Sequence, residues 1–134
     1  EQIYGSNPHP DLASSYNNIG GVYDHQGKYG EALEQYQKSL AIWKQIYASN
    51  PHPHLATSYN NIGGVYDHQG KYEQALGQYQ KSLAIWKQIY GSNSHPDLAI
   101  SYGNIGLVYY HQGKYEEALG QYQQALAIRK QIYG

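Results

Sequence analysis

Histidines are the first residues in this 134-residue chain to consider for chemistry, because there are seven of them and no cysteine. Zinc needs ligand nitrogens about 2 Å away, so its ligands must converge on one point. His52 and His54 are the closest pair in sequence, and they have no carboxylate beside them to complete a site. We therefore expect no bound metal and no cofactor.

Acid–base pairs are the second possibility, because Asp24 precedes His25 and Asp67 precedes His68. Neighbouring residues on a helix point in different directions, so neither pair can act together on one substrate atom. The sequence also has no thiol nucleophile, no Ser-His-Asp order and no Gly-rich phosphate loop. These absences predict that the chain is not an enzyme.

Charge and hydropathy exclude further classes. Nine basic and ten acidic residues give a net charge of −1, which removes the electrostatic case for a nucleic acid or an anionic membrane as partner. No window approaches eighteen apolar residues, the length that a membrane span needs. We find no secretory signal and expect a cytoplasmic protein. Because the chain starts at Glu1 without Met, we expect it to be a piece of a longer protein.

The elements that position these residues repeat along the chain. The segment Asn-Pro-His-Pro at residues 7–10 returns at 50–53 and, altered, at 93–96, so the period is 43 residues. Residues 7–49 and 50–92 differ at only six positions. We define repeat 1 as residues 7–49, repeat 2 as 50–92 and repeat 3 as 93–134; residues 1–6 match the end of a preceding repeat. Periods of 20–50 residues indicate solenoids or propellers.

Each repeat is predicted to form two helices. In repeat 1, apolar residues recur at spacings of three and four from about Pro10 to Gln26 and again from about Tyr29 to Tyr47. Pro10 suits a first helical turn, and Gly27 suits the left-handed conformation that ends a helix. No alternating strand pattern occurs. The sequence thus predicts an all-α fold of repeated helix-turn-helix units.

The spacing within a repeat resembles the tetratricopeptide (TPR) signature. Repeat 1 carries Tyr-x2-Ile-Gly-x2-Tyr at residues 16–23, Gly27, and Ala-x3-Tyr at residues 32–36, and both other repeats carry the same pattern in register. The unit is longer than the usual 34 residues and is similar to the lengthened repeats of kinesin light chains. This resemblance implies a right-handed α-solenoid whose first helices form a concave surface that binds a protein or peptide partner.

Within the first helix, the differences between repeats 2 and 3 all lie on one face. Repeats 2 and 3 differ there at 54/97, 57/100, 60/103, 64/107 and 67/110, steps of three and four that share a face. Three of the changes bring in Ile100, Leu107 and Tyr110, so the face becomes apolar in repeat 3. The resemblance makes this face, here called the concave stripe, the expected ligand-binding site; it comprises Ser14, Asn17, Gly21, Asp24, His25, Thr57, Asn60, Gly64, Asp67, His68, Ile100, Gly103, Leu107, Tyr110 and His111.

Two alternatives stay open at this point. The stripe could be a solvated face on which substitution costs little. The array could also serve as a structural spacer that associates end to end, because its first and last helices are built to meet a neighbouring repeat. Arg129 stands where the other repeats have Trp43 and Trp86, and we expect it to weaken that end-to-end contact.

Overall fold

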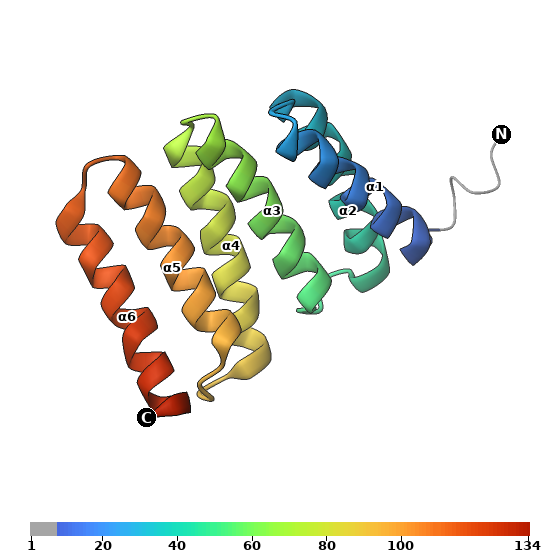
Figure 1. Cartoon of the computed structure of the whole chain (residues 1–134). Coiled ribbons are helices and arrows are strands. Elements are labelled where there is room, and N and C mark those ends of the chain that lie inside the picture. The colour runs from blue at the N-terminus through green and yellow to red at the C-terminus, as the bar shows by residue number, and fades with distance from the viewer. Residues whose placement is uncertain (1–7) are drawn as a thin grey trace, which may run out of the picture.

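The computed structural model describes residues 8–134 and contains six helices in that range, with no strand. The expected end of a preceding repeat, residues 1–6, lies outside the described residues. The helices pair into three hairpins arranged in a row, as Figure 1 shows. Their bounds are α1 Pro10–His25, α2 Tyr29–Tyr47, α3 Pro53–His68, α4 Tyr72–Tyr90, α5 Pro96–His111 and α6 Tyr115–Tyr133. The all-α solenoid expected from the sequence is confirmed.

The ends of the helices follow from particular residues. The side chain of His9, at the N-cap of α1, accepts a hydrogen bond from the backbone N–H of Asp11 at 3.0 Å, and Pro10 follows in the first turn. His52 and His95 cap α3 and α5 in the same way. Gly27 adopts φ +77° after α1, the left-handed conformation that glycine tolerates best. Three of the seven histidines therefore have a structural role that the sequence did not reveal.

Each hairpin is held together by a close approach between a glycine and a tyrosine ring. A Cβ on Gly20 would lie 2.8 Å from ring carbons of Tyr36, closer than carbon atoms pack. Gly63 has the same relation to Tyr79. Ala32 of α2 is fully buried. The sequence-based assignment of Gly20 to the helix contact is confirmed.

Successive hairpins bury the second helix of one repeat against the first helix of the next. Tyr36, Leu40 and Trp43 of α2 form one buried cluster with Leu55, Ile62 and Val65 of α3. Trp43 is buried, as expected of a residue between repeats, whereas Trp86 is partly exposed. A second buried cluster, formed by Leu76 and Tyr79 of α4 with Ile105 and Val108 of α5, lies at the next junction.

Candidate interaction surface

The first helices α1, α3 and α5 carry all fifteen residues of the concave stripe. Ser14, Thr57, Ile100, Leu107, Tyr110 and the three histidines of the stripe are exposed, whereas its asparagine, aspartate and glycine residues are partly buried. The stripe thus mixes accessible side chains with others that neighbouring residues cover. The contacts of the covered ones decide which residues are free to meet a ligand.

Asparagines link neighbouring repeats across the stripe. Asn61 Nδ2 donates a hydrogen bond to Asn17 Oδ1 at 2.9 Å, which joins α3 to α1. One repeat further on, Asn104 Nδ2 donates to Asn60 Oδ1 at 2.8 Å. These bonds place the first helices side by side. They also give Asn17 and Asn60 a structural role besides the expected binding role.

Aspartate and histidine form a second set of links. His68 Nδ1 donates to Asp24 Oδ1 at 3.0 Å, and His111 Nδ1 donates to Asp67 Oδ1 at the same distance. The Asp67 side chain is only 7 % exposed, so its carboxylate is largely unavailable to a ligand. His25 has no preceding repeat within the described residues and bonds the Gly21 carbonyl at 2.9 Å instead. The signal for these pairs was present in the sequence as an Asp–His spacing of 44 residues, one repeat plus one.

The end of the stripe in repeat 3 is accessible and apolar. Ile100 is 50 % exposed, Leu107 is 41 % exposed and Tyr110 is 54 % exposed. The corresponding residues of repeat 2 are Thr57, Gly64 and Asp67. These three side chains do not participate in the inter-repeat links, so they remain free to contact another molecule.

Two small cavities open between successive first helices, each bordered by a tryptophan of the intervening second helix. The first is lined by Ser14, Asn17, Asn18, Trp43, His54, Thr57 and Ser58. The second, one repeat further on, is lined by Thr57, Asn60, Trp86, Asp97, Ile100 and Ser101. The expected stripe therefore borders both cavities, but the tryptophans and residues 54 and 97 were not among its predicted members.

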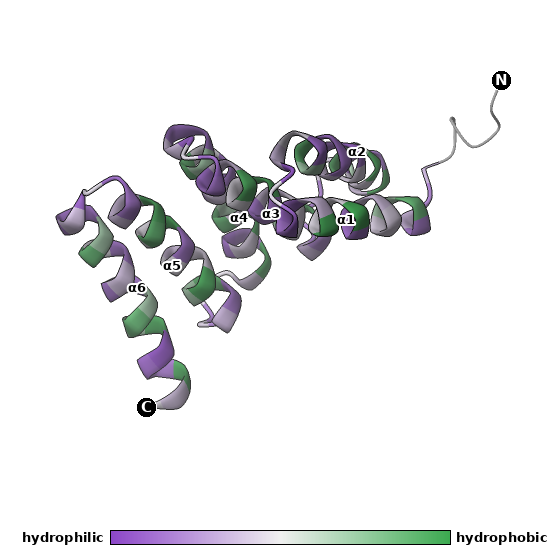
Figure 2. Cartoon of the chain, turned by 45° about the horizontal axis from the view of Figure 1, so that its top comes forward, coloured by the Kyte–Doolittle hydropathy of each residue, from purple (hydrophilic) through white to green (hydrophobic). Residues whose placement is uncertain are grey.

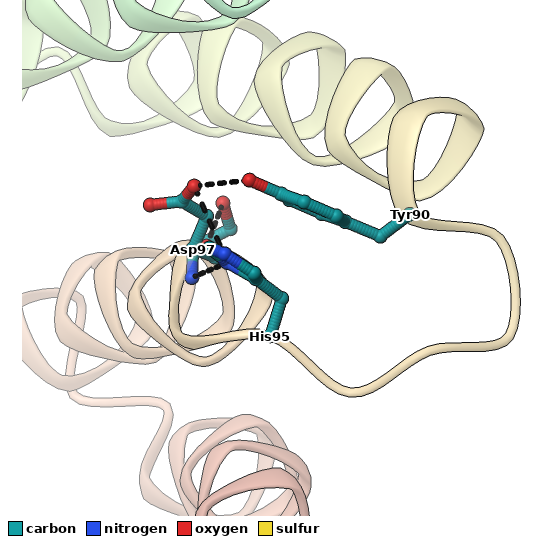
Figure 3. A network of polar contacts seen from close by, with 4 residues as sticks. Tyr90, His95 and Asp97 are labelled. Atoms are coloured by element: carbon teal, nitrogen blue, oxygen red, sulfur yellow. Dashed lines mark hydrogen bonds and ion pairs between the residues drawn. The ribbon is translucent and has the colours of Figure 1, made fainter. Parts of the chain in front are cut away.

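The loop between repeats 2 and 3 holds a polar network, drawn in Figure 3. Tyr90 donates its hydroxyl to Asp97 Oδ2 at 2.7 Å, and its ring stacks on His95 with centroids 3.9 Å apart. Burial, then the hydrogen bond to Asp97 and the negative charge of that carboxylate, raise the pKa of Tyr90 to about 12. The network fixes the entry of α5 against the end of α4.

The first turn of α3 has a histidine, His54, where the first turn of α5 has Asp97. The Tyr47 hydroxyl and His54 Nδ1 share a hydrogen bond of 2.9 Å, and the His54 ring stacks on Trp43 with centroids 4.1 Å apart. Burial, with the nearby His54 as a second cause, lowers the pKa of His52. The side chain at position 54 or 97 therefore always faces the second helix of the preceding repeat.

The described residues provide no group of three histidine or acidic side chains able to hold a metal ion. Within residues 8–134, no helix has both the length and the hydropathy to cross a bilayer.

Comparison with known proteins gives consistent results. A family model described as "Tetratricopeptide repeat" matches residues 2–45, 11–88 and 54–131. No curated protein sequence matches the chain.

Several solved structures share the fold. BtubC (BKLC) from P. vanneervenii superposes with a TM-score of 0.82 at 24 % identity, over 91 % of this chain and 48 % of that one. A putative kinesin light chain of Podosopora anserina, with nearly identical TPR-like repeats, gives a TM-score of 0.78 at 22 % identity, over 94 % and 59 % of the two chains. The N-terminal domain of stress-induced protein-1 from C. elegans gives 0.69 at 17 % identity, over 89 % and 85 %. The chain thus spans about half the length of the first two proteins.

Proposed function

Since the chain belongs to the tetratricopeptide repeat family, a family of protein-interaction scaffolds, we propose that it binds a peptide segment of a protein partner along the concave stripe. Its role in this proposal is binding rather than catalysis. The observation that carries the proposal is the exposed apolar cluster of Ile100, Leu107 and Tyr110. An apolar patch on a face without a neighbouring repeat is characteristic of an interaction site.

The contacts of the polar stripe residues refine where the ligand would lie. Asp24 and Asp67 already accept hydrogen bonds from histidines of the next repeat, so they offer little to a ligand lysine or arginine. The binding energy would come instead from the apolar cluster, together with the polar rims of the two cavities. Bulky apolar side chains in a partner are therefore favoured at the end of the stripe formed by repeat 3.

The two cavities suggest how the peptide would be spaced. Packed helices lie about 10 Å apart, and a peptide in the polyproline II conformation advances about 3.1 Å per residue with three residues per turn. Side chains three residues apart in such a peptide point to the same side and would therefore reach successive cavities beside Trp43 and Trp86. The first cavity is entirely polar apart from its tryptophan, while Ile100 adds an apolar wall to the second. We expect a polar or small side chain at the first and an apolar one at the second.

The solvated-face alternative has support of its own. The asparagine and Asp–His links hold the repeats in register, so these stripe residues have a structural use that needs no ligand. A spacer array would retain those links and would gain nothing from exposed Leu107. The apolar cluster therefore distinguishes a binding surface from a purely structural one.

Selection from a random peptide library against the immobilised chain tests the proposal. Selected peptides should carry bulky apolar residues, and Leu107→Glu should weaken their binding at least 10-fold, since a buried unpaired charge opposes an apolar contact. Gln80→Glu, an exposed position on α4 away from the stripe, is the matched control and should not change the affinity. Both variants should retain wild-type helicity. Peptides that bind the two variants equally well would disprove binding at this surface.

A further inference from the structure

The two cavities between successive first helices differ in what covers their tryptophan. At the first, the His54 ring stacks on Trp43 with centroids 4.1 Å apart and planes 16° apart, and Trp43 is 5 % exposed. At the second, Asp97 stands in place of the histidine, and Trp86 is partly exposed. Every residue that lines the second cavity lies on α3, α4 or α5. The uncovered tryptophan is therefore a feature of an interior junction.

Asp97 brings a negative charge to the second cavity. Its Oδ2 accepts the Tyr90 hydroxyl hydrogen bond and lies 3.4 Å from His95 Nδ1. That nitrogen accepts a hydrogen bond from the backbone N–H of Asp97, so it carries no proton and cannot be the cationic partner of the carboxylate. Figure 3 shows the other carboxylate oxygen pointing away from Tyr90 and His95. One oxygen of Asp97 is thus available to a donor from another molecule.

We propose, on the basis of the peptide binding proposed above, that the second cavity binds an arginine side chain of the partner, with its guanidinium stacked on Trp86 and hydrogen-bonded to Asp97. The first junction shows that a planar, nitrogen-containing group fits on the tryptophan at this position, because His54 lies there. A guanidinium is planar, stacks on aromatic faces and directs charged N–H donors at a carboxylate. A lysine ammonium is not planar and cannot stack in this way, so arginine is favoured.

The walls of the second cavity suit both parts of an arginine. Ile100, which is 50 % exposed, and Thr57 lie beside the apolar part of the side chain, which arginine packs against such surfaces while its charged end stays polar. In Figure 2, hydrophobic and hydrophilic residues alternate along α4 and α5, the helices that contribute Trp86 and Asp97. The apolar side chain expected here is thus narrowed to an apolar stem that ends in a cation.

NMR titration of the two indole N–H resonances with N-acetyl-arginine methylamide tests the site directly. One side chain binds weakly, so the titration runs to about 50 mM at constant ionic strength. The Trp86 resonance should shift and saturate, while that of Trp43 should not move. The lysine and citrulline derivatives, which lack the planar shape and the charge respectively, should bind at least about 5-fold more weakly. Asp97→Asn should weaken arginine binding about 5- to 10-fold.

Exchanging the residues of the two junctions provides matched variants. Asp97→His reproduces the first junction and should close the site on Trp86. His54→Asp reproduces the second junction and should open a site on Trp43, whose resonance should then respond to the arginine derivative. Each variant carries a residue that another repeat has at the same position, so both should keep wild-type helicity. A Trp86 resonance that arginine does not shift, or that it shifts equally in Asp97→His, would overturn the proposal.

The titration uses no peptide, so its failure is distinguishable from a failure of peptide binding. If selected peptides depend on Leu107 while the arginine derivative leaves Trp86 unaffected, the arginine site is wrong and the proposed function stands. If the derivative binds at Trp86 but no peptide is selected, the arginine site stands and the proposed function is wrong. Peptides that carry arginine and lose affinity about 5- to 10-fold in Asp97→Asn would support both.

Discussion

Two adjacent glycines in α3 should respond in opposite ways to the same substitution. A Cβ at Gly63 would lie 2.9 Å from two ring carbons of Tyr79, whereas a Cβ at Gly64 would lie 3.5 Å from the Tyr79 hydroxyl, an ordinary contact distance. Carbon atoms pack best at about 3.5–4.0 Å, so alanine at Gly63 overlaps the ring by more than half an ångström. Alanine at Gly64 fits without displacement.

The expected magnitudes follow from this difference. Replacing glycine by alanine in a helix interior contributes about 0.5–1 kcal/mol of stability at either position. Overlap with a ring in a packed core costs about 1–3 kcal/mol, and Tyr79 is buried against Leu76, Ile105 and Val108. Gly64→Ala should therefore stabilise the chain. The free energy of unfolding of the Gly63→Ala variant should be about 1–3 kcal/mol lower than that of the Gly64→Ala variant, because the gain in helix propensity is the same in both.

Urea unfolding followed by circular dichroism at 222 nm measures both free energies of unfolding. Gly20→Ala and Gly21→Ala form a replicate pair in α1, because their Cβ atoms would lie 2.8 Å and 3.6 Å from Tyr36 atoms. Equal unfolding free energies for Gly63→Ala and Gly64→Ala would show that the ring moves freely. The close approach would then not be a constraint on this fold.

Three further predictions concern the junctions between repeats. Ala48→Gly should raise the free energy of unfolding by about 1 kcal/mol, because Ala48 ends α2 at φ 54° and ψ −121°, a conformation that strains a side-chain-bearing residue. Trp43→Ala should lower it by about 3–5 kcal/mol in the same urea assay, while Ser14→Ala, an exposed change, stays within about 0.5 kcal/mol. Asp97→Asn should lower the pKa of Tyr90 from about 12 toward 10, as measured by NMR titration of the tyrosine Cζ resonances.

Each of these predictions has its own control. Gly91 ends α4 with φ 61°, so Gly91→Ala should destabilise the chain where Ala48→Gly stabilises it. If Trp43→Ala and Ser14→Ala changed the free energy of unfolding equally, Trp43 would not contribute to the junction between repeats. For Tyr90, the folded pKa lies above the ordinary value of about 10, so its contribution is present below pH 10 and lost as the pH rises through about 12. A titration of Tyr90 unaffected by Asp97→Asn would contradict the role of that carboxylate.

Local patterns in the sequence were sufficient to predict the helices and their pairing into hairpins. The structure confirms α2 at Tyr29–Tyr47 as predicted, and α1 ends at His25, one residue before the expected Gln26. Gly20 was also correctly assigned to the helix contact, and Ala32 is fully buried. These features depend on the 3.6-residue period, on the turn glycine and on the size of the side chains that meet within one hairpin. All three can be recognised in short stretches of sequence.

Contacts between repeats were decided by the tertiary structure. The sequence placed Asp24, His68 and Asn17 on one stripe, and the 44-residue spacing from Asp24 to His68 was visible in it. That spacing alone did not indicate that Asp24 binds His68 or that Asn61 binds Asn17. The sequence likewise gave no sign that His9 accepts a hydrogen bond as an N-cap. Helical periodicity assigns a residue to a face of its own helix. Which residues meet across two faces depends on the shift and rotation from one hairpin to the next, and these arise only when the large side chains of the junction, Trp43 among them, pack together.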